Sequence, residues 1–250
     1  MGAAIVGGLL AAGWPGASIS IVELLPARRA QLVDMFPSVT LSADIQPCTA
    51  ALIAVKPYDV VAATQQAVSQ GASKILSIAA GISLATLEQA AGTGVSVIRS
   101  MPNTPALVGQ GAAAICGGQF ATPADIHWAA SILQAVGTVV QVPESQLDAV
   151  TGLVGSGPAY LFLVAEALVE GGVLAGLSRS NAEALVHQLL TGSAALLADR
   201  GDPAALRAMV TSPGGTTAAG LRVLEQHAVR SAMIEAVMAA TERSKALGLA

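Results

Sequence analysis

The feature that most constrains the fold is a change of pattern near residue 143. Up to that point, short apolar stretches suited to β-strands alternate with stretches suited to helices, and beyond it only helical patterns follow. Alternation of this kind predicts a parallel or mostly parallel sheet with helices against its faces. We therefore expect an α/β domain over residues 1–143 and an all-helical domain over residues 144–250.

The expected elements follow from apolar periodicity and from turn and capping residues. In the first half, helices are predicted at residues 2–13, 26–36, 84–91 and 123–136. Strands are predicted there at residues 18–22, 51–55, 74–79, 95–99, 111–116 and 138–142. In the second half, helices are predicted at residues 146–153, 158–175, 179–199, 203–211 and 216–247. Thr122 and Pro123 provide an N-cap and a first helical residue for the helix that follows them.

The composition favours an oligomer. Charged residues are 11% of the chain and hydrophobic residues 53%. Because so few charges cannot cover a monomer, we expect apolar surface to be buried between subunits. The net charge of -4, with 12 scattered Lys and Arg residues, argues against nucleic acid as the main partner.

One long uncharged stretch raises the question of a membrane span. Between Asp148 and Glu166 there is no charge, but glycines and Pro158 predict a short helix, a turn and the start of another helix. A span needs about 20 uninterrupted apolar residues. No basic-then-apolar leader is visible at the start of the sequence. We therefore expect a soluble protein of the cytoplasm.

No metal or disulfide site is expected. Cys48 and Cys116 lack a CxxC spacing, which favours two buried, reduced thiols. The three histidines stand singly in helical patterns, where a structural role is the commoner one: His127, His187 and His227.

The start of the sequence resembles a dinucleotide-binding fold entered part of the way through. Such a fold needs a strand, then G-x-G-x-x-G, then a helix whose first amides hold the pyrophosphate. Here the helix comes first, so Gly2 fits the last glycine and Glu23, about 20 residues on, fits the acid that binds the adenosine ribose. We expect a Rossmann-like domain whose first strand is missing from this sequence, through a misplaced start codon or, alternatively, a real truncation.

The cofactor preference stays open at this point. Glu23 favours NADH, because it accepts from the 2′-hydroxyl and repels a 2′-phosphate. Arg28 and Arg29 are placed to pair with that phosphate, which favours NADPH. Alternatively, the two arginines form an ordinary solvated helix face.

Two segments follow predicted strand ends, where ligands collect in such sheets. Lys56 and Pro57 follow the apolar strand at residues 51–55, which places an ammonium at the edge of the sheet. In Met-Pro-Asn-Thr-Pro at residues 101–105, two prolines fix a loop that presents Asn103 and Thr104. The Asn103 amide suits a nicotinamide carboxamide or a small substrate; the alternative is a rigid turn in which Asn103 serves the backbone.

The segment at residues 210–217 leads directly into a predicted amphipathic helix. Its glycines leave the backbone open to a ligand, and the amides at a helix N-terminus favour an anion. Ser212, Thr216 and Thr217 add hydroxyl groups. This pattern predicts a cradle for a carboxylate or small phosphate; alternatively, Thr216 is a plain N-cap after a Gly-Gly turn.

Four blocks, in this order and spacing, resemble those of pyrroline-5-carboxylate reductases. They are Ala-Val-Lys-Pro at 54–57, Arg-Ser-Met-Pro-Asn-Thr-Pro at 99–105, Gly-Ser-Gly-Pro-Ala-Tyr at 155–160 and Val-Thr-Ser-Pro-Gly-Gly-Thr-Thr at 210–217. The resemblance implies hydride transfer from NADPH or NADH to the C=N carbon of 1-pyrroline-5-carboxylate, giving L-proline. It also implies a homodimer through the C-terminal helices that can build a larger ring. One departure is Val154, where the family usually has a small hydroxyl residue.

The resemblance assigns roles to particular residues. The catalytic candidates are Thr217, as orienter or proton relay, and Asn103. The cofactor-binding candidates are Gly2, Glu23, Ala54, Val55, Lys56, Pro57, Asn103 and Thr104. The substrate-binding candidates are Ser212, Gly214, Gly215, Thr216 and Thr217.

Two other functions fit parts of the pattern. The chain can be a catalytically impaired, truncated paralogue that acts only as a structural or dimerising subunit. It can also be a reductase of another cyclic imine or of a 3-hydroxy acid. The hydroxy-acid reaction needs a lysine base in the helical domain, and Lys245 is the only lysine after residue 143.

Overall fold

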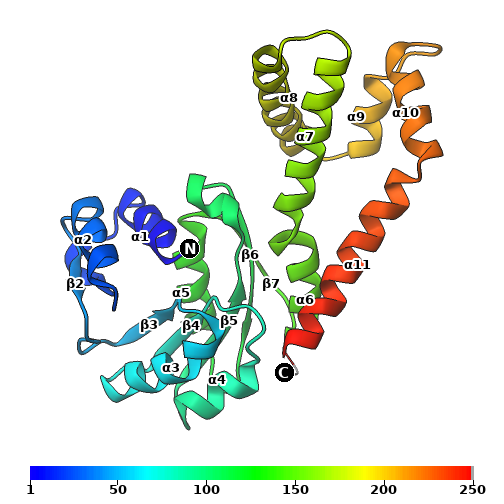
Figure 1. The fold of residues 1–250 in the computed structure, drawn as a ribbon. Helices are drawn as coiled ribbons and strands as arrows, with labels where there is room; N and C mark the ends of the chain where they lie inside the picture. Colours follow the sequence, from blue (N-terminus) through cyan, green and yellow to red (C-terminus); the bar gives the residue numbers. More distant parts are fainter. Residues whose placement is uncertain (249–250) are drawn as a thin grey trace. The chain divides into compact units, whose positions relative to one another are not determined.

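The computed structural model describes residues 1–248, and it divides into two compact units. The first unit is Met1–Ser156 together with the end of the chain from Met238, and the second is Gly157–Val237. Leu249 and Ala250, the last residues of the predicted helical domain, lie outside the described residues (Figure 1).

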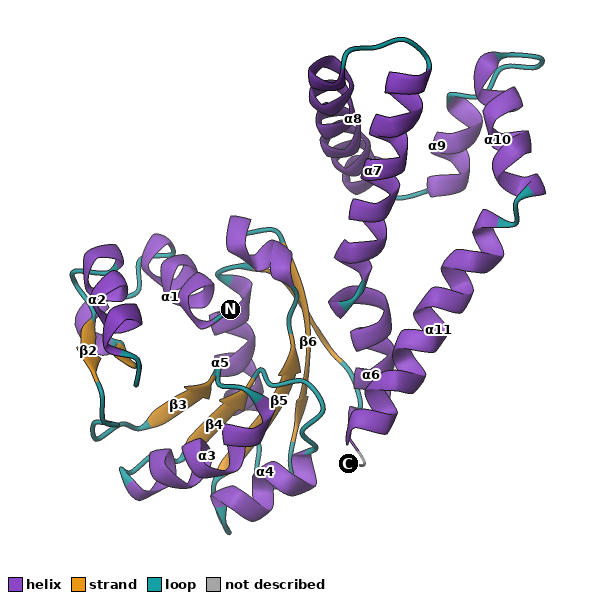
Figure 2. Cartoon of the chain, in the orientation of Figure 1, coloured by secondary structure: helices purple, strands orange, loops and turns teal. Residues whose placement is uncertain are grey.

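The first unit is built on a five-stranded sheet in the order β3-β4-β5-β6-β7 (Figure 2). Its strands are β3 (Ala50–Ile53), β4 (Lys74–Ser77), β5 (Ser96–Met101), β6 (Gly111–Gly117) and β7 (Gly137–Gln141). β3, β4 and β5 are parallel; β6 is antiparallel to β5, and β7 is parallel to β6. The predicted, mostly parallel sheet is thus confirmed for these strands.

A separate two-stranded parallel sheet pairs β1 (Ser20–Val22) with β2 (Thr40–Ser42). The alternating pattern predicts one sheet, and it does not predict β2. A strand of three residues with one apolar side chain, Leu41, has too little alternation to be detected. Its pairing with β1 over a distance of 20 residues is what makes it a strand.

Helices cover both faces of the five-stranded sheet, as expected for strands that are apolar on both sides. One face packs against α3 (Val60–Ser69), α4 (Leu84–Ala91) and α6 (Leu147–Val150). The other face packs against α1 (Gly2–Ala11) and α5 (Pro123–Gln134). Alternate residues of β5 divide between the two cores, since Val97 faces the first set of helices and Ile98 the second.

Helix α1 also connects the small sheet to the large one. Ile5 and Leu9 are buried in the core beneath the large sheet. Val6 and Leu10 pack on the cluster that contains Leu32 of α2 (Pro26–Met35), the helix that covers the small sheet. The predicted start of α5 is confirmed: the Thr122 side chain caps the helix, with Pro123 in its first turn and Asp125 completing a capping box.

The second unit contains helices alone, as predicted. They are α7 (Gly157–Leu174), α8 (Arg179–Arg200), α9 (Pro203–Met209), α10 (Thr216–Gln226) and the first part of α11 (Val229–Gly248). The prediction of one helix over residues 216–247 was wrong. The chain breaks after Gln226, and Ala228 adopts a φ of 53°. No glycine or proline marks this break, and alanine favours helix, so no local signal predicts it.

Helical structure begins near the predicted position, but the compact units divide later. β7 ends at Gln141 and helical residues start at Glu144, whereas the first unit continues to Ser156. The turn predicted before Pro158 was also wrong. The chain stays helical through Thr151–Gly155 as a π-helical turn, and only Ser156 bends. Proline is tolerated there because it lies in the first turn of α7.

As a result, residues 144–174 form one long helical run. By length and composition alone this run could cross a membrane, and only 11% of its apolar window is buried within the chain. Apolar side chains on α7 are therefore exposed in this single chain, among them Leu161, Phe162 and Leu163.

Candidate active site

The first residue of α1 lies beside the end of β3. A Cβ atom added to Gly2 would sit 3.2 Å from the Cβ of Ala54. The first turn of α1 carries no acidic residue, and no side chain caps it. Its first amides are thus unpaired within the helix and favour an anion. Two predicted cofactor residues, Gly2 and Ala54, are brought together by this packing.

Residues 54–57 form an exposed turn, not the end of a strand. β3 ends at Ile53, whose carbonyl accepts from Ile78 N at 3.2 Å, so the predicted strand to Val55 was two residues too long. Pro57 begins a short 3-10 helix, and α3 follows only at Val60. The Lys56 side chain is exposed beyond the strand end, which leaves its ammonium free to meet an anionic group.

Glu23 directly follows β1, in the small sheet. Its carboxylate accepts from Leu25 N at 3.0 Å, and its carbonyl accepts from Arg29 Nη1 at 2.6 Å. Arg28 Nη1 donates to Gln31 Oε1 at 2.9 Å. Each of these side chains therefore has a neighbour within its own strand-to-helix connection, and both arginines are half-buried, not solvated.

Asn103 and Thr104 follow β5 at the same edge as Ala54. Thr104 begins a 3-10 helix that packs beside α1. The Asn103 carboxamide is bonded at both ends: Oδ1 accepts from Ala112 N at 2.8 Å, and Nδ2 donates to the Val154 carbonyl at 3.2 Å. The geometry thus matches the alternative in which Asn103 serves the backbone.

The 210–217 segment lies in the second unit and has the predicted shape of a cradle. Gly214 has a φ of 68°, and Gly215 N donates to the Ser212 carbonyl at 3.0 Å. A Cβ on Gly215 would displace Ser212 Oγ and would press on the Ser212 carbonyl oxygen, 3.2 Å away. Gly215, not Thr216, is the N-cap of α10, and no side chain occupies the cap. The first amides and hydroxyls of α10, from Thr216 and Thr217, therefore face no acidic neighbour in the first turn.

An ion pair near the start of the helical region was not predicted from the sequence. Glu144 Oε1 accepts from Arg99 Nη1 at 2.8 Å and from Leu84 N at 2.6 Å. The acid thereby compensates a buried arginine and caps the start of α4. Glu144 after Pro143 resembles any acidic helix start, and its partners lie 45 and 60 residues away in sequence. No local signal identifies them.

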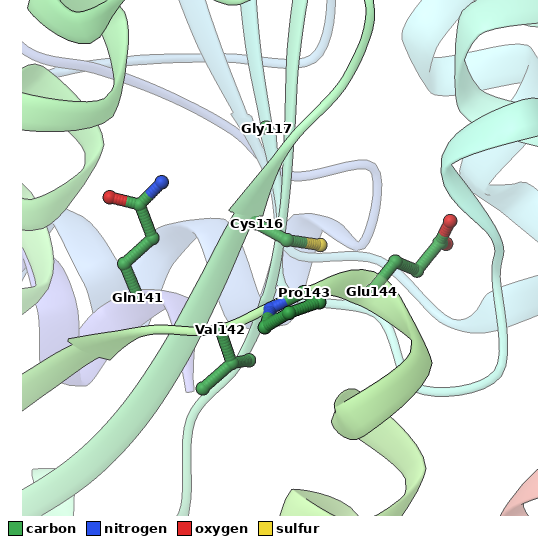
Figure 3. Close-up of a pocket in the computed structure, with 6 residues that line it drawn as sticks. All are labelled: Cys116, Gly117, Gln141, Val142, Pro143 and Glu144. Carbon is green, nitrogen blue, oxygen red and sulfur yellow. The ribbon is translucent and has the colours of Figure 1, made fainter.

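Cys116 is paired with Arg99 across β5 and β6, next to this acid. Burial, and then the Glu144 charge, raise the pKa of the Cys116 thiol to about 11. Cys116 and Glu144 line an open cavity of about 480 Å³ at the ends of β6 and β7. Figure 3 shows the thiol pointing to the side on which Glu144 lies, whereas Gln141 points the other way. None of the motif residues lines this cavity, so it carries no part of the proposed chemistry.

Among residues 1–248, no cluster of three or more His, Cys, Asp and Glu side chains is arranged to hold a metal ion. All three histidines are exposed.

Comparison with known proteins places this geometry in a family. Residues 144–247 match the family model described as pyrroline-5-carboxylate reductase dimerisation. The pyrroline-5-carboxylate reductase of Mycobacterium tuberculosis is 42% identical over 275 aligned residues, covering 99% of this chain and 93% of that relative.

Two solved structures agree with this match. The Coxiella burnetii pyrroline-5-carboxylate reductase superimposes with a TM-score of 0.90 at 31% identity, covering 98% of this chain and 93% of that one. The Plasmodium falciparum pyrroline carboxylate reductase gives a TM-score of 0.86 at 28% identity, covering 99% of this chain and 94% of that one. The chain belongs to the pyrroline-5-carboxylate reductase family.

Proposed function

We propose that this chain reduces 1-pyrroline-5-carboxylate to L-proline, the last step of proline biosynthesis. The observation that carries the proposal is 42% identity over 99% of the chain to a pyrroline-5-carboxylate reductase. In this reaction a hydride adds to the C=N carbon and a proton to the nitrogen, so one double bond is reduced. NADPH or NADH supplies the hydride.

The first unit is the proposed cofactor-binding part. The free amides at the start of α1 and the exposed ammonium of Lys56 suit a pyrophosphate, and a side chain at Gly2 would press on Ala54. The Plasmodium falciparum relative was solved with NADP bound. The residues proposed to line the cofactor are Gly2, Glu23, Ala54, Val55, Lys56, Pro57 and Thr104.

The second unit supplies the proposed substrate carboxylate site. The carboxylate would meet the first amides of α10, with Ser212, Gly214, Gly215, Thr216 and Thr217 around it. No His, Cys or Asp falls in this segment. We therefore assign Thr217, which is half-buried in the first turn, to orienting the imine or relaying its proton, with positioning supplying much of the rate.

The choice between NADPH and NADH rests on Glu23 and the two arginines that follow it. Replacing Glu23 by Gln removes the charge that opposes a 2′-phosphate. The ratio of kcat/KM for NADPH to that for NADH should then rise if Glu23 lies at the ribose, and an unchanged ratio would remove Glu23 from the cofactor site.

We further propose a cytoplasmic homodimer formed through the helices of residues 144–250, able to assemble into a larger ring. The family match over residues 144–247 carries a dimerisation description, and this region exposes many large apolar side chains in a single chain. A partner subunit gives the apolar helical run at residues 144–174 a protein surface to pack against. Residues 1–143 are the corresponding cofactor domain.

The deciding experiment is oxidation of NADPH and NADH by the purified protein with pyrroline-5-carboxylate. Turnover supports the proposal, whereas a folded dimer without turnover would leave the structural-subunit alternative. Thr217→Ala should lower kcat by about a hundredfold, the low end of what a proton-transfer group contributes. Thr191→Ala is the matched control, because Thr191 is an exposed residue of α8 bonded to its own helix. Equal turnover of wild type and Thr217→Ala would remove Thr217 from the mechanism.

A further inference from the structure

The carbonyl of Val154 cannot make the hydrogen bond of a regular α-helix. In an α-helix this oxygen accepts from the N–H four residues along, which here belongs to Pro158, and proline has no N–H. The chain forms a π-helical turn over Thr151–Gly155 at this point, with Ser156 N donating to the Thr151 carbonyl at 2.9 Å. A half-buried carbonyl left without a donor destabilises the turn.

Asn103 supplies the missing donor. Its Nδ2 donates to the Val154 carbonyl at 3.2 Å, and its Oδ1 accepts from Ala112 N at 2.8 Å. One side chain therefore joins three segments: the loop after β5, the start of β6 and the π-helical turn. The antiparallel pairing of β5 with β6 already holds the first two segments together, so the bond to Val154, 51 residues from Asn103, is the one that ties the turn to them.

The turn is also pressed against the end of β5. A Cβ on Gly155 would sit 2.5 Å from Met101 Cε, two residues before Asn103. The end of the Met101 side chain therefore lies over Gly155, and a larger residue there would displace this flexible tip. Met101 and Asn103 thus contact the same turn from one short loop.

We propose that Asn103 is a positioning residue that clamps the π-helical turn to the sheet and thereby fixes the loop carrying Thr104. This replaces the role of direct cofactor or substrate ligand that its motif predicts. Its effect on catalysis rests on the proposed function. The bond itself does not, since it concerns only the described geometry of the first unit.

The test is a double-mutant cycle between Asn103→Ala and Pro158→Ala. Pro158→Ala returns an N–H to the position that can serve the Val154 carbonyl, so the Asn103 donor becomes redundant. In the wild-type background, Asn103→Ala should lower kcat/KM about tenfold. In the Pro158→Ala background the same substitution should cost at least threefold less, the remainder being the lost bond to Ala112 N.

A ligand contact gives a different result. If Asn103 binds the nicotinamide or the imine directly, its replacement lowers kcat/KM and NADPH affinity by the same factor in both backgrounds, which would overturn the proposal. Asn181→Ala, an exposed asparagine on α8, is the control and should be without effect in either background.

The same double-mutant cycle can be measured without an activity assay, from the urea unfolding midpoints of the wild type, the two single variants and the double variant. Coupling between positions 103 and 158, with Asn103→Ala shifting the midpoint less once Pro158 is replaced, supports the clamp even if the wild type shows no turnover. Additive midpoints would overturn it. Failure of the proposed function and failure of the clamp are therefore separate results.

Discussion

Asp125→Asn is the substitution whose effect the structure specifies most fully. Asp125 is buried, with 6% of its surface exposed, and its two oxygens have separate partners. Oδ1 pairs with Lys74 Nζ at 2.7 Å, while Oδ2 accepts from Thr122 N at 3.0 Å and Thr122 Oγ1 at 2.7 Å. Lys74 also lies 5.9 Å from the centre of the Trp128 ring. The acid thus links the start of β4 to the start of α5.

The magnitude follows from which contacts asparagine keeps. Its single oxygen can still accept from Thr122, but its amide nitrogen then faces the Lys74 ammonium. The charge-assisted bond is lost, which is worth about 1.5–3 kcal/mol. Because the Lys74 side chain is 36% exposed, water compensates in part. We expect a loss of about 2 kcal/mol in the free energy of unfolding, roughly a 30-fold change in the folding equilibrium.

The loss of unfolding free energy caused by Asp125→Asn should depend on pH. Burial alone would raise the pKa of Asp125, but the hydrogen bonds from Lys74 and Thr122 outweigh burial and hold the pKa well below its usual range. A carboxyl whose pKa is lower in the folded state stabilises the protein above its unfolded pKa of about 3.9 and loses that contribution as the pH falls toward the folded value. The difference between wild type and Asp125→Asn should therefore be constant from pH 5 to 8 and shrink below pH 4.

Urea unfolding followed by tryptophan fluorescence measures this difference. Both tryptophans, Trp14 and Trp128, lie in the first unit, so the signal reports on the unit that contains Asp125. Asp34→Asn, an exposed acid on α2, is the control for loss of charge. A loss below about 0.5 kcal/mol, the size expected of an exposed ion pair, would refute the reasoning. So would a difference that stays the same down to pH 3.5.

Four further predictions concern single positions. Cys116, with a pKa of about 11, should react with iodoacetamide at pH 8 at least tenfold more slowly than the less buried Cys48. Peptide mass spectrometry follows both rates, and equal rates would contradict the burial of the Cys116 thiol. Gly137→Ala should destabilise by about 3 kcal/mol or more, because φ is 154° and the new Cβ would sit 1.9 Å from the Gly111 carbonyl oxygen. Gly220→Ala, in open space on α10, should instead stabilise by about 1 kcal/mol. Thermal melting measures both variants, and equal melting temperatures for Gly137→Ala and Gly220→Ala would contradict both predictions. Ala228→Gly should raise the melting temperature slightly by relieving the positive φ of 53°, and a lower temperature would show that this conformation carries no strain.

Much of the fold could be predicted because the cues were local. α4 matches its predicted bounds, and the cap of α5 could be read from Thr122 and Pro123 alone. The features that were missed depend on distant partners. β2 exists through its pairing with β1, and the acid that compensates Arg99 comes from Glu144, 45 residues along the chain. Periodicity and capping rules contain no information about such pairs.

In the candidate site, too, the features set by local sequence could be predicted and those set by distant partners could not. The turn at residues 212–215 and the start of α10 were predictable because both are local, and no side chain caps this helix start; its use as an anion cradle stays a prediction. That Asn103 serves the backbone was one of the two interpretations of its motif, but its partner in the turn was not predictable, because that bond depends on the Val154 carbonyl and on the N–H that Pro158 lacks.

This contrast bears on how motif residues should be assigned. A side-chain amide in a loop near a cofactor edge is chemically suited to a ligand, and it is equally suited to an orphaned backbone carbonyl. Once both ends of the Asn103 amide are bonded to the protein, using it for a ligand would mean breaking one of those bonds or sharing its remaining donor. The first amides of α1 and α10 face no such competition, because a helix leaves them unpaired by construction. Backbone groups at these two helix starts are therefore stronger candidates for holding anionic ligands than the most conspicuous polar side chain in the motifs.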